Sequence, residues 1–356
     1  MIGSDSMMED WTAEESAEQP GRGELRAEFP SVHKAARISI ALQRTFRIPD
    51  DGSEYPLPPG LGTFPMAAVD DLRGDVPAQW REEGGFVMPM YQSEALWMCF
   101  SPSGEEAFGV PYPFTVKVVS GRINALTGED DTNGLVAKPQ NYCAVPEQPW
   151  LDGFCVEKGI IRQFVAMPLG EGYTVDEQLK GDAGHGGLAF EITPLKREKY
   201  LALVAEHAAK GDRPPRMFEH FSCEAAPMGM GAGGRMRQEI YEDPFTPDDY
   251  DTEATIRLPL HICNSMAWRT ATGAEPPHPP WTAEDYARKG LPWFEWYSEK
   301  PAIQGGAKLQ GIKSVAELAD AKGAKWLSAD KGVKAAPVVA LGPDAPLSAA
   351  PKASGS

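Results

Sequence analysis

The stretch FTVKVVSGRINAL, Phe114–Leu126, predicts a β-hairpin. Phe114, Val116 and Val118 alternate with polar residues, which is the pattern of a strand with one buried face. The pair Ser120-Gly121 then supplies the two-residue turn that joins antiparallel strands. Antiparallel pairing is therefore expected to organise this part of the chain.

Similar patterns lie on both sides of this hairpin. A second hairpin is predicted in WLDGFCVEKGIIRQFVAMPL, residues 150–169, with its turn at Glu157–Gly159. Further strands are predicted in RISIALQRTFRI (37–48), YQSEALWMCF (91–100) and GLAFEITPL (187–195).

Helix signals gather in the second half of the chain. Capping boxes, in which a Thr or Ser is followed three residues later by an acid, occur at Thr174, Thr282 and Ser314. The longest helical pattern is PLKREKYLALVAEHAAKG (194–211), and a short helix is expected in DVPAQWREEGG (75–85). A buried strand is predicted in EATIRLPLHICNSMAW (253–268).

Separate runs of strands and helices favour an α+β fold over a parallel doubly wound sheet. We expect an antiparallel β-rich portion over residues 36–195 and a mixed helix and strand portion over 196–323, packed on it. The acidic segment 1–35 and the Ala/Pro/Ser-rich tail 324–356 are expected to be flexible.

Charge and composition exclude several classes of protein. The 356 residues carry a net charge of −17, which disfavours binding to nucleic acid and to anionic membranes. No apolar run approaches the roughly 18 residues of a spanning helix, and the acidic start does not resemble a signal peptide. The five cysteines are scattered, which favours a reducing compartment, the cytoplasm. Cys143 and Cys155 are interpreted as buried free thiols, with a disulfide between them as the alternative.

The stretch GMGAGGRMRQ, residues 229–238, matches the GxGxxG pattern of dinucleotide-binding proteins at Gly229, Gly231 and Gly234. A working dinucleotide loop needs a strand before the first glycine and a helix after the last. The preceding segment is broken by Pro227, and the following one is stopped by Pro244. We therefore expect no dinucleotide cofactor, and no other cofactor is indicated.

Two interpretations of this stretch remain. One is a flexible loop that leads into a short helix. The other is an anion site, in which free glycine amides and basic side chains hold a phosphate or carboxylate. Its candidate residues are Gly231, Gly233, Gly234, Arg235, Arg237 and Gln238.

Histidines and a cysteine supply candidate catalytic groups. His261 and Cys263 are two apart on a predicted strand, so they would share a face as a nucleophile with its base, as metal ligands, or as core residues. His185 lies among glycines, where Asp182 could polarise it as a base, or where it could belong to a surface loop. A metal site is not expected, because CxxC and HExxH motifs are missing.

Aromatic residues cluster in EQPWLDGF (147–154) and KGLPWFEWY (289–297). Such residues can form a ligand shelf or a partner-binding patch, or they can cover the core. The candidates are Trp150, Trp293, Phe294, Trp296 and Tyr297.

The stretches QPWLDGF (148–154), GRMRQEIYEDP (234–244) and NSMAWRTATG (264–273) with GLPWF (290–294) resemble a family of microbial proteins, some of which carry the loose label "integral membrane protein". The resemblance runs from about Arg44 to about Gly323. It implies no activity, cofactor or catalytic residue, and its membrane label conflicts with the missing apolar span.

Two functions are consistent with these patterns. The first is a soluble binding or interaction protein that contacts a protein partner through the aromatic residues and the Gly/Arg stretch. The second is an enzyme or small-molecule binder that holds an anionic substrate with Arg235 and Arg237 and uses His261, Cys263 or His185 for chemistry. The second requires these residues to converge on one pocket.

Overall fold

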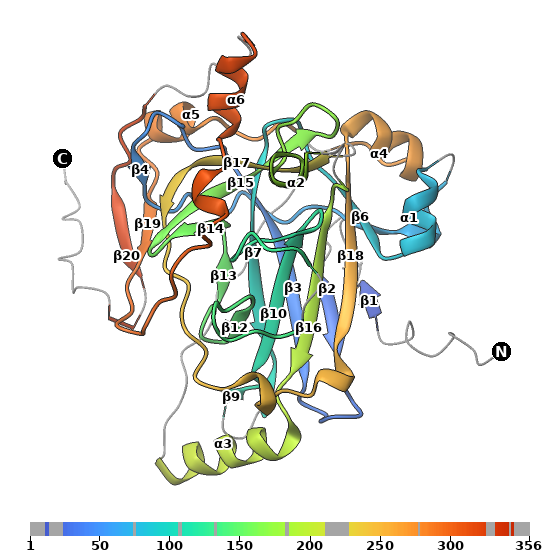
Figure 1. Cartoon of the computed structure of the whole chain (residues 1–356), viewed down its shortest axis with the longest axis vertical. Helices are drawn as coiled ribbons and strands as arrows, with labels where there is room; N and C mark the ends of the chain where they lie inside the picture. The colour runs from blue at the N-terminus through green and yellow to red at the C-terminus, as the bar shows by residue number, and fades with distance from the viewer. Residues whose placement is uncertain are drawn as a thin grey trace, which may run out of the picture.

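The computed structural model of the chain describes residues 11–13, 24–73, 76–105, 109–131, 134–181, 185–210, 228–276, 278–324, 332–341 and 343–344. Two mostly antiparallel sheets with helices around them form an α+β fold (Figure 1). Strands predicted at residues 37–48, 91–100 and 187–195 are confirmed.

The larger sheet is nine-stranded. Its strands follow the order β1 (Trp11–Ala13), β2 (Leu25–Glu28), β3 (Arg37–Thr45), β7 (Ala95–Pro102), β15 (Ile160–Pro168), β17 (Met228–Arg237) and β4 (Glu54–Tyr55), with β13 (Trp150–Leu151) paired to β7 and β14 (Gly153–Glu157) to β15. The predicted hairpin of residues 150–169 is the β14–β15 pair, and Gly159 in its turn has a φ of +74°. Only β4 runs parallel to its neighbour in this sheet, among the strands that the structure describes.

The smaller sheet is seven-stranded and contains the predicted hairpin of residues 114–126. Its order is β11 (Ile123–Asn124), β10 (Phe114–Ser120), β16 (Leu188–Pro194), β18 (Ile256–Cys263), β6 (Phe86–Pro89) and β5 (Ala67–Ala68), with β12 (Cys143–Val145) paired to β10. Two short pairs stand apart: β8 (Gly104–Glu105) with β9 (Val110–Pro111), and β19 (Trp293–Trp296) with β20 (Val338–Leu341).

One hydrophobic core is shared by the two sheets. Ile40 and Phe164 from the larger sheet and Val116, Phe190 and Leu260 from the smaller one belong to the same buried cluster. The alternation that predicted the first hairpin therefore points its apolar side chains into this core.

Among the described residues, six α-helices surround the sheets, and Val175 and Tyr200 from two of them reach into this core. The helices are α1 (Ala78–Glu83), α2 (Val175–Lys180), α3 (Arg197–Lys210), α4 (Ser265–Thr272), α5 (Ala283–Arg288) and α6 (Val315–Ala321). Figure 1 shows α3 and α6 at opposite ends of the molecule. Complete capping boxes are confirmed at Thr174 and Ser314, and the Thr282 side chain accepts from the amide of Asp285. The strand predicted over 253–268 ends at Cys263, because α4 takes up the rest. No helix in the described ranges is long and apolar enough to cross a membrane.

The two predicted portions, residues 36–195 and 196–323, each contribute strands to both sheets. β17, from the mixed portion, lies between β15 and β4, and β18 pairs with β16. Residues 24–35 of the segment predicted as flexible are instead built in, because β2 pairs with β3 and Leu25 is buried. Residues 11–13 form β1, and part of the tail forms β20. Residues 1–10, 14–23, 325–331, 342 and 345–356 of the two ends lie outside the described residues.

Candidate functional site

An aromatic pocket of about 320 Å³ opens beside the turn between β14 and β15. Its walls come from five separate segments of the chain, four of them at Leu57, Trp150, Ile160 and the pair Trp296 and Tyr297. Arg237, Gln238, Glu239 and Tyr241 line it from the end of β17 onward. We call this site the aromatic pocket.

Strand pairing brings these segments together. Trp150 begins β13, where it lies opposite Cys99 on β7, and the amide of Leu57 donates to the carbonyl of Phe294 in β19 at 2.8 Å. Ile160 lies opposite Arg237 in the β15–β17 ladder. Backbone hydrogen bonds therefore fix the spacing of the segments that carry the pocket walls, so little backbone ordering would be needed on binding.

The tryptophans form a corner. The rings of Trp150 and Trp296 are 4.8 Å apart between centroids and nearly perpendicular, at 82°. The ring of Trp97 is also edge-to-face with that of Trp150, at 6.5 Å between centroids and 70°. Edge-to-face packing of this kind holds each ring in place. Tyr297 is 37% exposed, so the pocket is open to a ligand on its side.

Buried polar groups support the walls. Gln238 donates from Nε2 to a carboxylate oxygen of Asp152 at 2.6 Å, and its Oε1 accepts from the Asp152 amide at 3.0 Å. Burial raises the pKa of Asp152 to about 7, while the Gln238 hydrogen bond opposes the rise. Gln148 accepts from the amide of Tyr241 at 3.0 Å and donates to the carbonyl of Trp150 at 2.8 Å. The hydrogen-bonded side-chain amides of Gln148 and Gln238 thus hold neighbouring segments of the pocket wall in place.

Both arginines of the predicted anion site are held by acids. The Arg237 guanidinium is bonded to Glu295, whose other oxygen accepts from the Tyr297 hydroxyl at 2.8 Å. Arg235 contacts Glu157 at 2.9 Å and Glu54 at 3.4 Å. Arg237 lines the aromatic pocket, but its charge is balanced there.

The prediction that the glycine-rich stretch is a loop leading into a short helix is wrong. Residues 228–237 form β17, and Gly231 pairs with Val165 on β15. Glycines are needed because a Cβ on Gly233 would lie 2.6 Å from a methyl carbon of Val165, and one on Gly234 would lie 2.5 Å from the carbonyl oxygen of Pro49. Close packing between neighbours, rather than anion binding, therefore explains the glycines.

The candidate catalytic residues lie elsewhere. The His261 ring stacks on Trp80 at 5.2 Å, and its Nε2 is 3.0 Å from the carbonyl oxygen of Gly84. Burial lowers the pKa of His261 and raises the pKa of the Cys263 thiol, so both are held neutral. His185 contacts Glu83 at 3.1 Å. Asp182, its predicted partner, lies outside the described residues.

The histidines and the arginines are not brought together. The amide of Gly187 bonds the carbonyl of Met228, at the start of β17, and a Cβ on Gly187 would lie 2.8 Å from the carbonyl oxygen of Leu260. His261 therefore lies near the start of β17. Arg235 lies seven residues further along that strand, or roughly 23 Å at the usual rise per residue.

Trp293 and Phe294 serve the fold. Trp293 is fully buried, and its ring packs against Phe46 at 5.2 Å and Tyr286 at 6.1 Å. Phe294 is half-buried and bridges to Leu57. Of the predicted residues, Trp150, Trp296, Tyr297, Arg237 and Gln238 thus line one pocket. Sequence reasoning missed Glu239 and Tyr241. Their positions two and four residues after Arg237 were the available signal of an extended segment.

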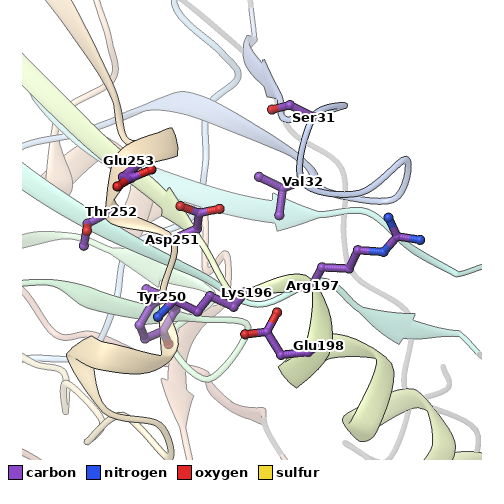
Figure 2. Close-up of a pocket in the computed structure, with 9 residues that line it drawn as sticks. All are labelled: Ser31, Val32, Lys196, Arg197, Glu198, Tyr250, Asp251, Thr252 and Glu253. Carbon is purple, nitrogen blue, oxygen red and sulfur yellow. The ribbon is translucent and has the colours of Figure 1, made fainter.

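A second pocket of about 410 Å³ lies where α3 begins (Figure 2). Charged side chains of both signs line it, and Figure 2 shows Arg197 extending away from Lys196 and Glu198. The Lys196 ammonium donates to the carbonyl of Asp248 at 2.7 Å. None of the predicted site residues lines this pocket.

The four cysteines that the structure describes, Cys99, Cys143, Cys155 and Cys263, are buried free thiols, so the free-thiol interpretation of Cys143 and Cys155 is confirmed. Burial raises the pKa of Cys155 to about 12. No group of three or more His, Cys, Asp or Glu in the described ranges is arranged to hold a metal ion.

No protein-family model, no curated protein and no solved structure matches the chain. Its function is therefore inferred from the geometry of the aromatic pocket.

Proposed function

We propose that this chain is a binding protein that recognises a segment of a protein partner through the aromatic pocket. The observation that carries the proposal is the meeting of Trp150, Trp296 and Tyr297 with Arg237 and Gln238 around one opening. Tryptophan, tyrosine and arginine are the residue types that supply most binding energy at protein interfaces. Backbone pairing holds their positions before any partner arrives.

The surface next to the pocket supports this proposal. The described residues include five exposed large hydrophobic side chains, and three of them, Tyr297, Val338 and Val339, lie on or directly beside the β19–β20 pair. Val338 is 42% and Val339 39% exposed, and as successive strand residues they point to opposite faces of the pair. Tyr297 is the exposed apolar residue that lines the pocket itself.

The enzyme alternative has less support. It requires Arg235 and His261 to act in one pocket, but they lie near opposite ends of β17. Cys263 and His261 are buried, with pKa shifts that keep each of them neutral. We also propose a cytoplasmic location, which is consistent with the buried free thiols of the described cysteines.

A peptide display selection tests the proposal. Peptides selected on the wild-type chain are expected to bind Trp296→Leu and Tyr297→Ser at least about tenfold more weakly, because truncating a hot-spot aromatic costs roughly 2 kcal/mol. Trp281→Leu is the matched control, because Trp281 is 46% exposed and does not line the pocket. Equal binding to all four proteins would overturn the proposal.

A further inference from the structure

We infer that the group recognised in the aromatic pocket is a cationic side chain, lysine or arginine, of a basic segment in the partner. This inference rests on the proposed function and names the chemistry of its ligand. The glycine and arginine stretch alone favours an anionic ligand, whereas the acidic residues around the pocket favour a cationic one.

The aromatic walls are suited to a cation. A charged ammonium or guanidinium group is attracted to the face of a tryptophan ring within about 6 Å of its centroid. The edge-to-face contact leaves Trp150 and Trp296 as perpendicular walls of one opening, with Tyr297 at its exposed side. A side chain with an apolar stem and a charged end can pack against both walls at once.

The charges around the pocket are negative on balance. Arg237 is neutralised by Glu295, and Lys300 just beyond the pocket is bonded to Glu147. Glu239 lines the pocket and forms no ion pair with any residue that the structure describes. Asp344 lies beside it, because its amide bonds the carbonyl of Tyr297 and its carboxylate accepts from the amide of Glu299.

The same negative charge is felt inside the pocket. Burial raises the pKa of Tyr241 to about 12, and the charges of Glu239 and Asp344 add to the rise. The net charge of the whole chain, −17, acts in the same direction at longer range. Basic partners are therefore attracted, and acidic ones are repelled.

The size of the pocket admits a long side chain. A volume of about 320 Å³ is at the lower end of the range for small-molecule sites. It therefore has room for one lysine or arginine side chain together with part of a neighbouring residue of the partner segment.

Short peptides that differ at one position test the inference. Four otherwise identical blocked peptides carry lysine, arginine, norleucine or glutamate at the centre, and binding is followed by NMR through the indole N–H signals of Trp150 and Trp296. Norleucine keeps the apolar stem of lysine without its charge. We expect the lysine and arginine peptides to bind at least about fivefold more tightly than the norleucine peptide, which corresponds to about 1 kcal/mol.

Two substitutions give opposite signs. Arg237→Gln frees Glu295 and is expected to tighten binding of the lysine peptide, whereas Glu239→Gln is expected to weaken it. Asp70→Asn, an exposed acid that does not line the pocket, is the matched control for overall charge and is expected to leave binding unchanged. The inference would be overturned if the glutamate peptide bound more tightly than the lysine peptide. It would also be overturned if Arg237→Gln no longer bound the lysine peptide.

The failure of this inference is distinguishable from that of the proposed function. If display-selected peptides depend on Trp296 but bind equally well with norleucine in place of their basic residues, the pocket remains a recognition site and the cation assignment is wrong. If neither the selected peptides nor the short ones depend on Trp296 or Tyr297, both are wrong.

Discussion

At the scale of single residues, the carboxyl group of Asp152 helps to hold Gln238 in the wall of the aromatic pocket. This side chain is 2% exposed and has Gln238 as its hydrogen-bond partner. Since Gln238 lines the pocket, the protonation of Asp152 is linked to the position of a pocket residue. No sequence pattern marked Asp152, because its burial comes from the fold.

The raised pKa of Asp152 predicts how stability changes with pH. The folded chain keeps this proton between the ordinary pKa of 3.8 and about 7, where the unfolded chain has released it. The folded state then binds more protons, so its free energy of unfolding falls as pH rises through this window. Asp152→Asn removes the titrating group, so the variant does not show this fall in the free energy of unfolding. In the wild type the fall is on the order of 2–4 kcal/mol.

Urea unfolding at about pH 5 and about pH 8 checks this prediction. The variant is expected to gain stability relative to the wild type at the higher pH. A difference in free energy between the two proteins that stays constant with pH would show that Asp152 ionises normally in the folded chain.

Arg237 shows the limit of reading a single residue. An arginine beside glycines favours an anion site when the sequence is considered alone. The structure supplies Glu295 as its partner, from a strand that no local pattern connects to it. The residue does line a pocket, while the charge available there depends on a carboxylate far away in the sequence.

At the scale of elements, the hairpins could be predicted and β17 could not. Both hairpins have a glycine with positive φ in the turn, Gly121 and Gly159, and the strand at 114–120 alternates apolar and polar residues. Local sequence therefore locates both turns to within one residue. β17 is rich in glycine, which weakens the strand pattern. Its strand conformation comes from pairing with β15 and β4, whose residues are far away in the sequence.

Close packing against β17 predicts that replacing Gly234 lowers the free energy of unfolding. A Cβ on Gly234 would lie 2.5 Å from a backbone oxygen of Pro49 and 3.0 Å from Ile48. Gly234→Ala must therefore move the backbone and is expected to destabilise the chain by about 1–3 kcal/mol.

The matched control is Gly311→Ala, since a Cβ there would meet nothing within 4 Å. Its effect is expected to stay within about 0.5 kcal/mol. Urea midpoints of both variants measure the contrast. Equal midpoints for the two variants would mean that β17 tolerates side chains at this position and that its glycines have another purpose.

At the scale of the whole molecule, the pocket is a product of the fold. Its walls come from chain segments near residues 57, 150, 160, 237 and 297, which the larger sheet and the β19–β20 pair bring to one place. The sequence allowed the aromatic and arginine groups to be singled out separately. Their convergence depends on long-range pairing, which one sequence does not specify.

The same long-range pairing decides which candidate residues meet. His261 on β18 and Arg237 at the far end of β17 were both predicted site residues, but only Arg237 reaches the aromatic pocket. The fold therefore separates the residues that the enzyme alternative combines.

The most direct measurement is an NMR map of the surface on which a display-selected peptide binds. We predict that the largest shifts fall on the indole N–H signals of Trp150 and Trp296 and on the amides of Arg237 to Tyr241, with Trp281 unchanged. Shifts centred instead on the charged pocket at the start of α3, or on Trp281, would contradict the assignment of the aromatic pocket as the recognition site.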